Sequence, residues 1–182
     1  SSESHQENSA SGLFHSKIQS EKDVENELVK EFRSTSGFIM LNTSSQNIDR
    51  IVSVFRACKR SGRFMIIDLY TAAVLAATGN ENIPQSAWDG VKLFTPNSQR
   101  VHIKNYEMFG LLDAHSENRI YPEDLHKIVH KSVMLVRPVH LPDLRKLAKV
   151  DEGQKSPFNG CKFIYSQWAG YLHQTSFNTF RS

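Results

Sequence analysis

The sequence predicts an α/β fold: a three-layer α/β/α domain with Rossmann-like topology and a mostly parallel sheet of about five strands. Short apolar runs alternate along the chain with segments of helical periodicity. The apolar runs are continuous, which is typical of strands covered on both faces. Repeated β-α units with short connections then favour parallel strands between two helical layers.

Five apolar runs are the expected strands: residues 37–41, 63–68, 91–94, 133–136 and 163–165. The first three expected helices cover residues 21–34, residues from 48 to a stop at 60–62, and residues 71–78. Three more are expected from 96–98 through Leu112, from Pro122 onward, and over residues 142–150. Ser20 and Asp23 resemble a capping box with Asp in place of Glu, which sets the start of the first helix. Gly62 and Gly79 are expected to end the second and third helices.

Composition is that of an ordinary globular protein, with 39% hydrophobic and 23% charged residues in 182. We expect residues 1–20 to form a flexible arm or surface loop and residues 21–182 to form one domain. A formal charge of +3 is compatible with a polyanionic partner, but the sequence lacks the dense Lys/Arg stripe of a dedicated nucleic-acid binder. Two cysteines outside any C-x-x-C pair, no signal-peptide core and no apolar run of about 20 residues indicate a soluble cytoplasmic protein without a membrane partner.

The polar run from Asn42 to Arg50 lies between an expected strand and an expected helix. Such a turn gathers unpaired backbone N–H groups at the positive end of a helix dipole, which suits an anion such as phosphate. The carboxyl ends of the other parallel strands meet at the same edge. The candidate substrate-binding residues are therefore Ser44, Ser45, Asn47, Arg50, Asp68 and Arg137.

Each of these candidates also has a structural interpretation. Ser44 and Ser45 suit helix capping, which is compatible with anion binding by the adjacent N–H groups. Arg50 lies one turn into its helix, where a cation opposes the dipole unless it has an anionic partner. Asp68 and Arg137 stand at strand ends, where either can bind a neighbouring loop or a ligand.

Motifs for catalysis and metal binding are absent from the sequence. Neither G-x-x-x-x-G-K-[ST] nor G-x-G-x-x-G occurs, and no G-x-S-x-G elbow surrounds a serine. His126 and His130 have the spacing of H-E-x-x-H, but Lys127 stands where the general base would be. No catalytic residue and no metal ligand is predicted.

Four ordered blocks carry a family resemblance: FIMLNTSSQNIDR at 38–50, RACKRSGR at 56–63, DLYTA at 68–72 and IYSQWAGYL at 164–172. Together they resemble the β-CASP region of metallo-β-lactamase-fold nucleases, with ribonuclease J and its bacterial relatives as the nearest group. The resemblance covers roughly residues 21 to 175. It implies a domain that caps a two-zinc site and helps to hold RNA or DNA against it.

The family's zinc motif, H-x-H-x-D-H, does not occur in this chain. The resemblance therefore implies zinc in a separate catalytic domain, no cofactor in this chain, and no hydrolysis by this chain alone. We expect either a domain excised from a larger nuclease or a stand-alone module.

These expectations combine into one hypothesis: a substrate-clamping β-CASP-like domain of a zinc-dependent hydrolase or nuclease that acts on nucleic-acid phosphodiesters, with RNA favoured. Two alternatives stay open. The first is a non-catalytic protein-interaction module, and the second is a small nucleotide-binding α/β domain.

Overall fold

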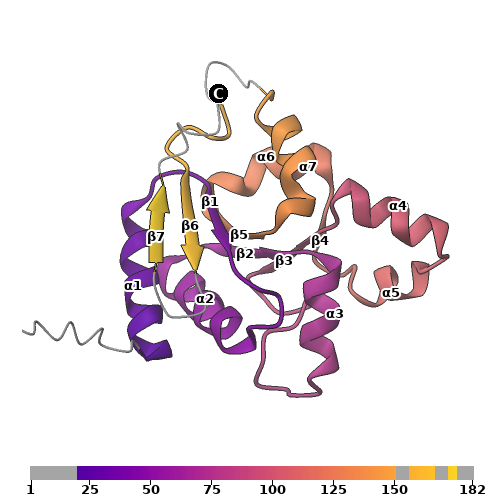
Figure 1. Cartoon of the computed structure of the whole chain (residues 1–182), viewed down its shortest axis with the longest axis horizontal. Helices are drawn as coiled ribbons and strands as arrows, with labels where there is room; N and C mark the ends of the chain where they lie inside the picture. Colours follow the sequence, from indigo (N-terminus) through magenta and orange to yellow (C-terminus); the bar gives the residue numbers. More distant parts are fainter. Residues whose placement is uncertain (1–19, 151–155, 167–171, 176–182) are drawn as a thin grey trace, which may run out of the picture.

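The computed structural model of the chain describes residues 20–150, 156–166 and 172–175 (Figure 1). The expected arm over residues 1–20 lies outside the described residues except for Ser20. Of the block 164–172, residues 167–171 also lie outside the described residues.

The described residues form one seven-stranded sheet with the order β4-β3-β2-β5-β1-β6-β7. Its strands are β1 Ile39–Asn42, β2 Phe64–Ile67, β3 Val91–Phe94, β4 Arg119–Ile120, β5 Ser132–Val136, β6 Lys162–Ser166 and β7 Leu172–Thr175. Strands β1 to β6 pair in parallel and β7 pairs antiparallel with β6. The α/β class and the mostly parallel sheet are thus confirmed, and all five expected strands are present. The two additional strands, β4 and β7, lack a continuous apolar run in the sequence.

The helices of the described part are α1 Glu21–Ser34, α2 Ile48–Ser61, α3 Leu69–Ala77, α4 Asn97–Asn105, α5 Phe109–Ala114, α6 Pro122–Ile128 and α7 Leu141–Leu147. Two 3₁₀ turns precede β5 and α7: η1 Val129–Lys131 and η2 Pro138–His140. None of the helices in this part of the chain has the length and apolar character that crossing a membrane requires.

Local signals in the sequence fix several helix ends. The hydroxyl of Ser20 accepts from the Asp23 N–H at 3.1 Å, and the Asp23 carboxylate accepts from the Ser20 N–H at 3.1 Å, which confirms the capping box. Gly62 ends α2 in the left-handed conformation at φ 71°, which a side chain would disfavour. Helix α3 begins two residues earlier than expected because Asp68 acts as its N-cap and accepts from the Thr71 N–H.

One helix expectation is wrong. The sequence predicts a single helix from 96–98 through Leu112, but the chain breaks after α4 and resumes as α5. Glu107 in the break has φ 53°, the one positive φ outside glycine among the described residues. Only Ile103 and Leu112 of these two helices are buried, so the apolar residues between them do not form one continuous stripe that would hold a single helix.

The sheet lies between two helical layers (Figure 1). One face carries Ile39 and Leu41 and packs with α1, α2 and α3 into the larger core. The opposite face carries Met40 and Met134 and packs with α6 and α7 into a second core. Because successive strand residues point to opposite faces, both cores draw on the same short strands.

Candidate functional site

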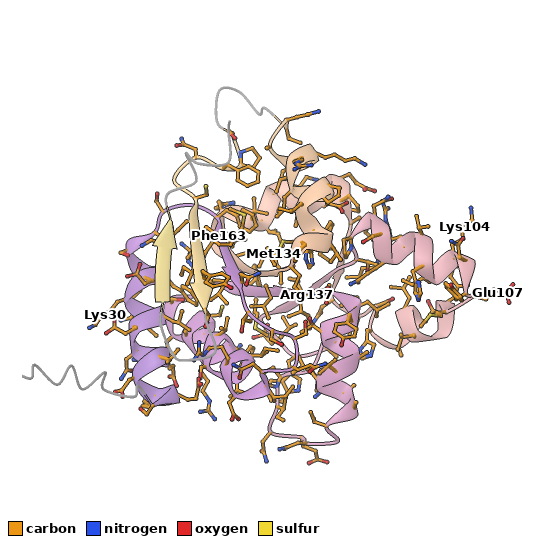
Figure 2. All side chains as sticks on the ribbon, viewed as in Figure 1. Lys30, Lys104, Glu107, Met134, Arg137 and Phe163 are labelled. Atoms are coloured by element: carbon orange, nitrogen blue, oxygen red, sulfur yellow. The ribbon has the colours of Figure 1, made fainter. Side chains whose placement is uncertain are left out.

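Strands β2 and β5 are neighbours whose connections leave the sheet toward opposite layers. The chain passes from β2 into α3 on one side, and from β5 through η2 into α7 on the other. Such divergence at the carboxyl ends of parallel strands is where open α/β sheets bind ligands. The residues that immediately follow these two strands are Asp68 and Arg137. Figure 2 shows Arg137 near the middle of the molecule, between α3 and α7.

Asp68 is the centre of the polar network at this edge, and its side chain is 1% exposed. One carboxylate oxygen, Oδ1, accepts from the Thr71 N–H at 2.8 Å. The other, Oδ2, accepts from Gln99 Nε2 at 2.8 Å and from Arg137 Nη2. Gln99 also accepts from the Leu69 N–H at 3.2 Å through Oε1, so it links α4 to the start of α3. With both oxygens occupied by donors, Asp68 braces the site and is not free to act as a general base.

Arg137 is the positive group of the site. Its side chain is 26% exposed, and its guanidinium carbon lies 4.9 Å from the ring centroid of Tyr70. Among the described residues the guanidinium has Asp68 as its hydrogen-bonding partner and no other. Because a guanidinium carries five N–H donors, most of them remain for a ligand. Tyr70 is 45% exposed, so the stacked pair faces solvent.

His140 fixes the backbone of Arg137. Its Nδ1 lies 3.0 Å from the Arg137 backbone N and 3.2 Å from the Arg137 carbonyl oxygen. Nδ1 accepts from the N–H in the tautomer protonated at Nε2 and donates to the carbonyl in the tautomer protonated at Nδ1. The Nε2 atom lies 3.5 Å from Asp68 Oδ2. His140 is 1% exposed, so it serves as a buried support for Arg137.

The environment sets the charge of both groups. Burial alone would raise the pKa of Asp68, but the Thr71 N–H and the positive charge of Arg137 hold that pKa below its usual value. Burial lowers the pKa of His140, and the Asp68 carboxylate only partly opposes this. At neutral pH the site therefore contains a carboxylate, a guanidinium and a neutral imidazole.

Arg50 lies apart from this network and has an anionic partner within the protein. Its Nε and Nη2 atoms each lie 3.3 Å from an oxygen of Glu21 in α1, and Nη1 donates to Ser166. The side chain is 3% exposed. Glu21 thus compensates the positive charge of Arg50, which opposes the α2 dipole. A role of Arg50 in substrate binding stays a prediction.

The remaining candidates in the polar run organise the start of α2. Asn47 is the N-cap and accepts from the Arg50 N–H at 3.1 Å. Ser44 is exposed and its hydroxyl accepts from the Gln46 N–H at 3.2 Å. Ser45 is buried, with its hydroxyl 3.1 Å from the hydroxyl of Thr71. Through Thr71 this turn touches the helix that Asp68 caps.

The structure thus brings Asp68 and Arg137 into direct contact, connects Ser45 to them through Thr71, and leaves Ser44, Asn47 and Arg50 in other contacts. The sequence placed Tyr70 and His140 on the expected ligand edge but did not single them out as site residues, and Gln99 was not predicted there. His140 has no local ligand pattern. Its position three residues after Arg137, at an expected strand end, was the one feature of the sequence that could have indicated its role in the site.

The residues at this edge do not fit a zinc ion. Both oxygens of Asp68 are engaged with donors, and the adjacent guanidinium would repel a cation. Elsewhere in the described part of the chain, no group of three or more His, Cys, Asp or Glu side chains is arranged to hold a metal. The arrangement instead suits an anion. Arg137 can bind the anion, and Asp68 holds the Arg137 side chain in place.

Comparison with known proteins does not assign the chain to a family. No model of a known protein family matches the sequence, and no curated protein matches it.

Proposed function

We propose that this chain positions a nucleic-acid strand by binding a backbone phosphate at the carboxyl edge of its sheet, with Arg137 as the principal contact. The observation that carries the proposal is the Arg137 guanidinium, stacked on the exposed ring of Tyr70 and held by the buried carboxylate of Asp68. An arginine presents planar paired donors that match phosphate oxygens. Its orientation is set before the ligand arrives, which lowers the entropic cost of binding.

The nucleic acid, rather than a small phosphate compound, is favoured by a second stacked pair on this side of the sheet. The guanidinium carbon of Arg119 lies 4.8 Å from the ring centroid of Tyr121, which follows β4 and is 49% exposed. Strand β4 is separated from β2 by β3 alone, so the tyrosines follow strands about 10 Å apart at the usual strand spacing. Exposed aromatic rings beside arginines are the platforms on which unpaired bases stack.

Within this proposal the chain is a substrate-clamping domain of the β-CASP type, and RNA is its favoured ligand. The polypeptide supplies positioning and the catalytic zinc ions belong to a separate metallo-β-lactamase-type domain. The chain on its own is then inactive as a hydrolase.

The test is a titration of labelled single-stranded RNA at two salt concentrations with Arg137→Gln. We expect the affinity to fall about tenfold, and the slope of log affinity against log salt to shrink by about 0.7, the value for one phosphate contact on a single strand. Arg56→Gln is the matched control, because Arg56 is an exposed arginine on α2 whose loss removes the same charge.

Arg137 also stabilises the fold through Asp68, so a second variant keeps that ion pair intact. Tyr70→Leu removes the ring under the guanidinium and should weaken RNA binding severalfold without loss of the folded state in circular dichroism. RNA binding that is unchanged in both variants, or lost equally in Arg56→Gln, would exclude the carboxyl edge as the binding surface.

A specific observation favours protein interaction as the second candidate function. The α4–α5 hairpin exposes three large apolar side chains: Val101, Tyr106 and Phe109. Figure 2 shows Lys104 and Glu107 at the outer end of the same hairpin, away from the sheet. Under this alternative, Tyr106→Ser with Phe109→Ser would abolish binding to a protein partner and leave RNA affinity unchanged. Under the leading proposal Arg137→Gln lowers RNA affinity.

A further inference from the structure

We propose a second binding site at the opposite, amino edge of the sheet, where Lys92 and Lys131 bind a phosphate group between them. Strands β2, β3 and β5 begin at this edge, so the site is separate from Asp68 and Arg137. Phosphate binding at this edge does not require the contact at Arg137.

Two lysines converge there on one aromatic ring. Phe64, the first residue of β2, is half-buried, and its ring centroid lies 5.1 Å from Lys92 Nζ and 5.4 Å from Lys131 Nζ. Lys92 belongs to β3 and Lys131 directly precedes β5, and these strands flank β2 on opposite sides. Within the part of the chain that the structure describes, no other ring contacts two cations.

No described carboxylate pairs with either ammonium group. Lys59 gives the contrast: it lies 5.9 Å from the ring centroid of Phe55, and its ammonium pairs with Asp89 at 2.8 Å. Asp89 is the acidic group nearest in sequence to Lys92, and it is engaged with Lys59. The hydrogen bond and charge of Lys59 lower the pKa of Asp89, and the charge of Lys92 also helps to lower it, but less. The two ammonium groups near the Phe64 ring thus have no ion-pair partner among the described residues.

A third positive charge lies next to this pair. Arg63, which precedes Phe64, is 9% exposed, and its guanidinium donates to backbone carbonyls. Two of these acceptors, His130 O and Ser132 O at 3.4 Å each, belong to the residues on either side of Lys131. Carbonyl oxygens satisfy the donors but carry no net charge, so among the described residues Arg63 has no carboxylate partner either.

Three positive charges, none of which forms an ion pair with a described carboxylate, create a positive potential that attracts anions. Each ammonium group can donate to a phosphate oxygen, and lysine commonly binds phosphate as a point charge. Contact with the Phe64 ring restrains both ammonium groups and so limits the entropy lost on binding. The phosphate can belong to a small phosphate compound or to a nucleic-acid backbone, because the two share this chemistry.

Isothermal titration of the full chain with inorganic pyrophosphate tests the site. We expect saturable binding that falls about tenfold in Lys92→Gln and in Lys131→Gln, as for loss of one charge-assisted hydrogen bond. Lys149→Gln is the matched control, since Lys149 is an exposed lysine beyond α7 and should bind like the wild type. The same titrations in the Arg137→Gln background remove the phosphate contact of the carboxyl edge, and the binding that depends on Lys92 and Lys131 should persist there, which separates the two sites.

A parallel titration uses a single-stranded oligonucleotide without a terminal phosphate. Its affinity is compared between Arg137→Gln and a triple variant that adds Lys92→Gln and Lys131→Gln. Pyrophosphate binding that depends on the lysines identifies a small phosphate compound as the source. Oligonucleotide binding with the same dependence, and no pyrophosphate binding, identifies the backbone. No lysine-dependent binding of either probe, or an equal loss in Lys149→Gln, overturns the proposal.

Discussion

Asp68 and Arg137 are 69 residues apart in the chain and form an ion pair across the carboxyl ends of neighbouring strands. Asp68 is buried and Arg137 is partly exposed, so the pair joins the protein interior to its surface. The carboxylate holds the guanidinium in one orientation, and the guanidinium compensates a buried negative charge. One interaction therefore supports both the fold and the candidate site.

Asp68→Asn should destabilise the protein by about 3 kcal/mol, because it leaves Arg137 without its carboxylate. Asparagine is itself a good N-cap, so α3 should keep its start. Urea unfolding measures the change. In a double-mutant cycle with Arg137→Met, the combined loss should be smaller than the sum of the two single losses. Strict additivity would show that the two side chains do not interact.

Stability should decline in two steps as the pH falls. Folding lowers the pKa of both His140 and Asp68, so the unfolded chain takes up protons first. Stability is then full above about pH 6.5, falls as the unfolded histidine becomes protonated, and falls again below about pH 4 as the unfolded aspartate does. His115, whose pKa burial also lowers, adds to the first step.

Urea unfolding from pH 8 to about pH 3 measures both steps, with His140→Gln as the comparison. The variant should lose less stability than the wild type between pH 7 and pH 5, whatever its stability at pH 8. Equal slopes in that range would contradict a contribution from His140.

Arg63→Lys should cost about 3 kcal/mol or more, although it keeps the charge. Arg63 donates to Phe32 O at 3.0 Å and to Gly37 O at 2.9 Å, as well as to the carbonyls around Lys131. A single ammonium cannot reach all of these acceptors, and each buried carbonyl left without a donor is costly. Thermal unfolding compares this variant with Arg145→Lys on the exposed face of α7, which should change stability by less than about 0.5 kcal/mol.

Gly37→Ala should destabilise the protein strongly, by more than about 2 kcal/mol. A methyl group at Gly37 would lie 2.4 Å from Asn159 O and 2.6 Å from Gly160 C, both backbone atoms that cannot move away cheaply. Gly110→Ala is the control within α5, because nothing lies within 4 Å of a methyl group there. The control should be neutral or stabilising by up to about 1 kcal/mol, the helix propensity difference. Similar midpoints of urea unfolding for the two variants would rule out the close backbone packing at Gly37.

The local elements were readable because their signals are local. The capping box at Ser20, the left-handed glycine at Gly62 and the continuous apolar run of β2 each depend on residues within a few positions. Strand β4 was missed because two residues carry no periodicity. The break at Glu107 was missed because it depends on which side chains find a core to pack against.

The sequence by itself determined the α/β class, the two-sided burial of the strands and the expectation that polar strand ends share one edge, because these follow from hydrophobic patterning. Only the tertiary structure decided which of those polar residues meet. Arg50 is paired with Glu21 from α1, while Arg137 meets Asp68 because β5 is placed beside β2. Strand order is a property of the whole chain, and no local spacing in the sequence encodes it.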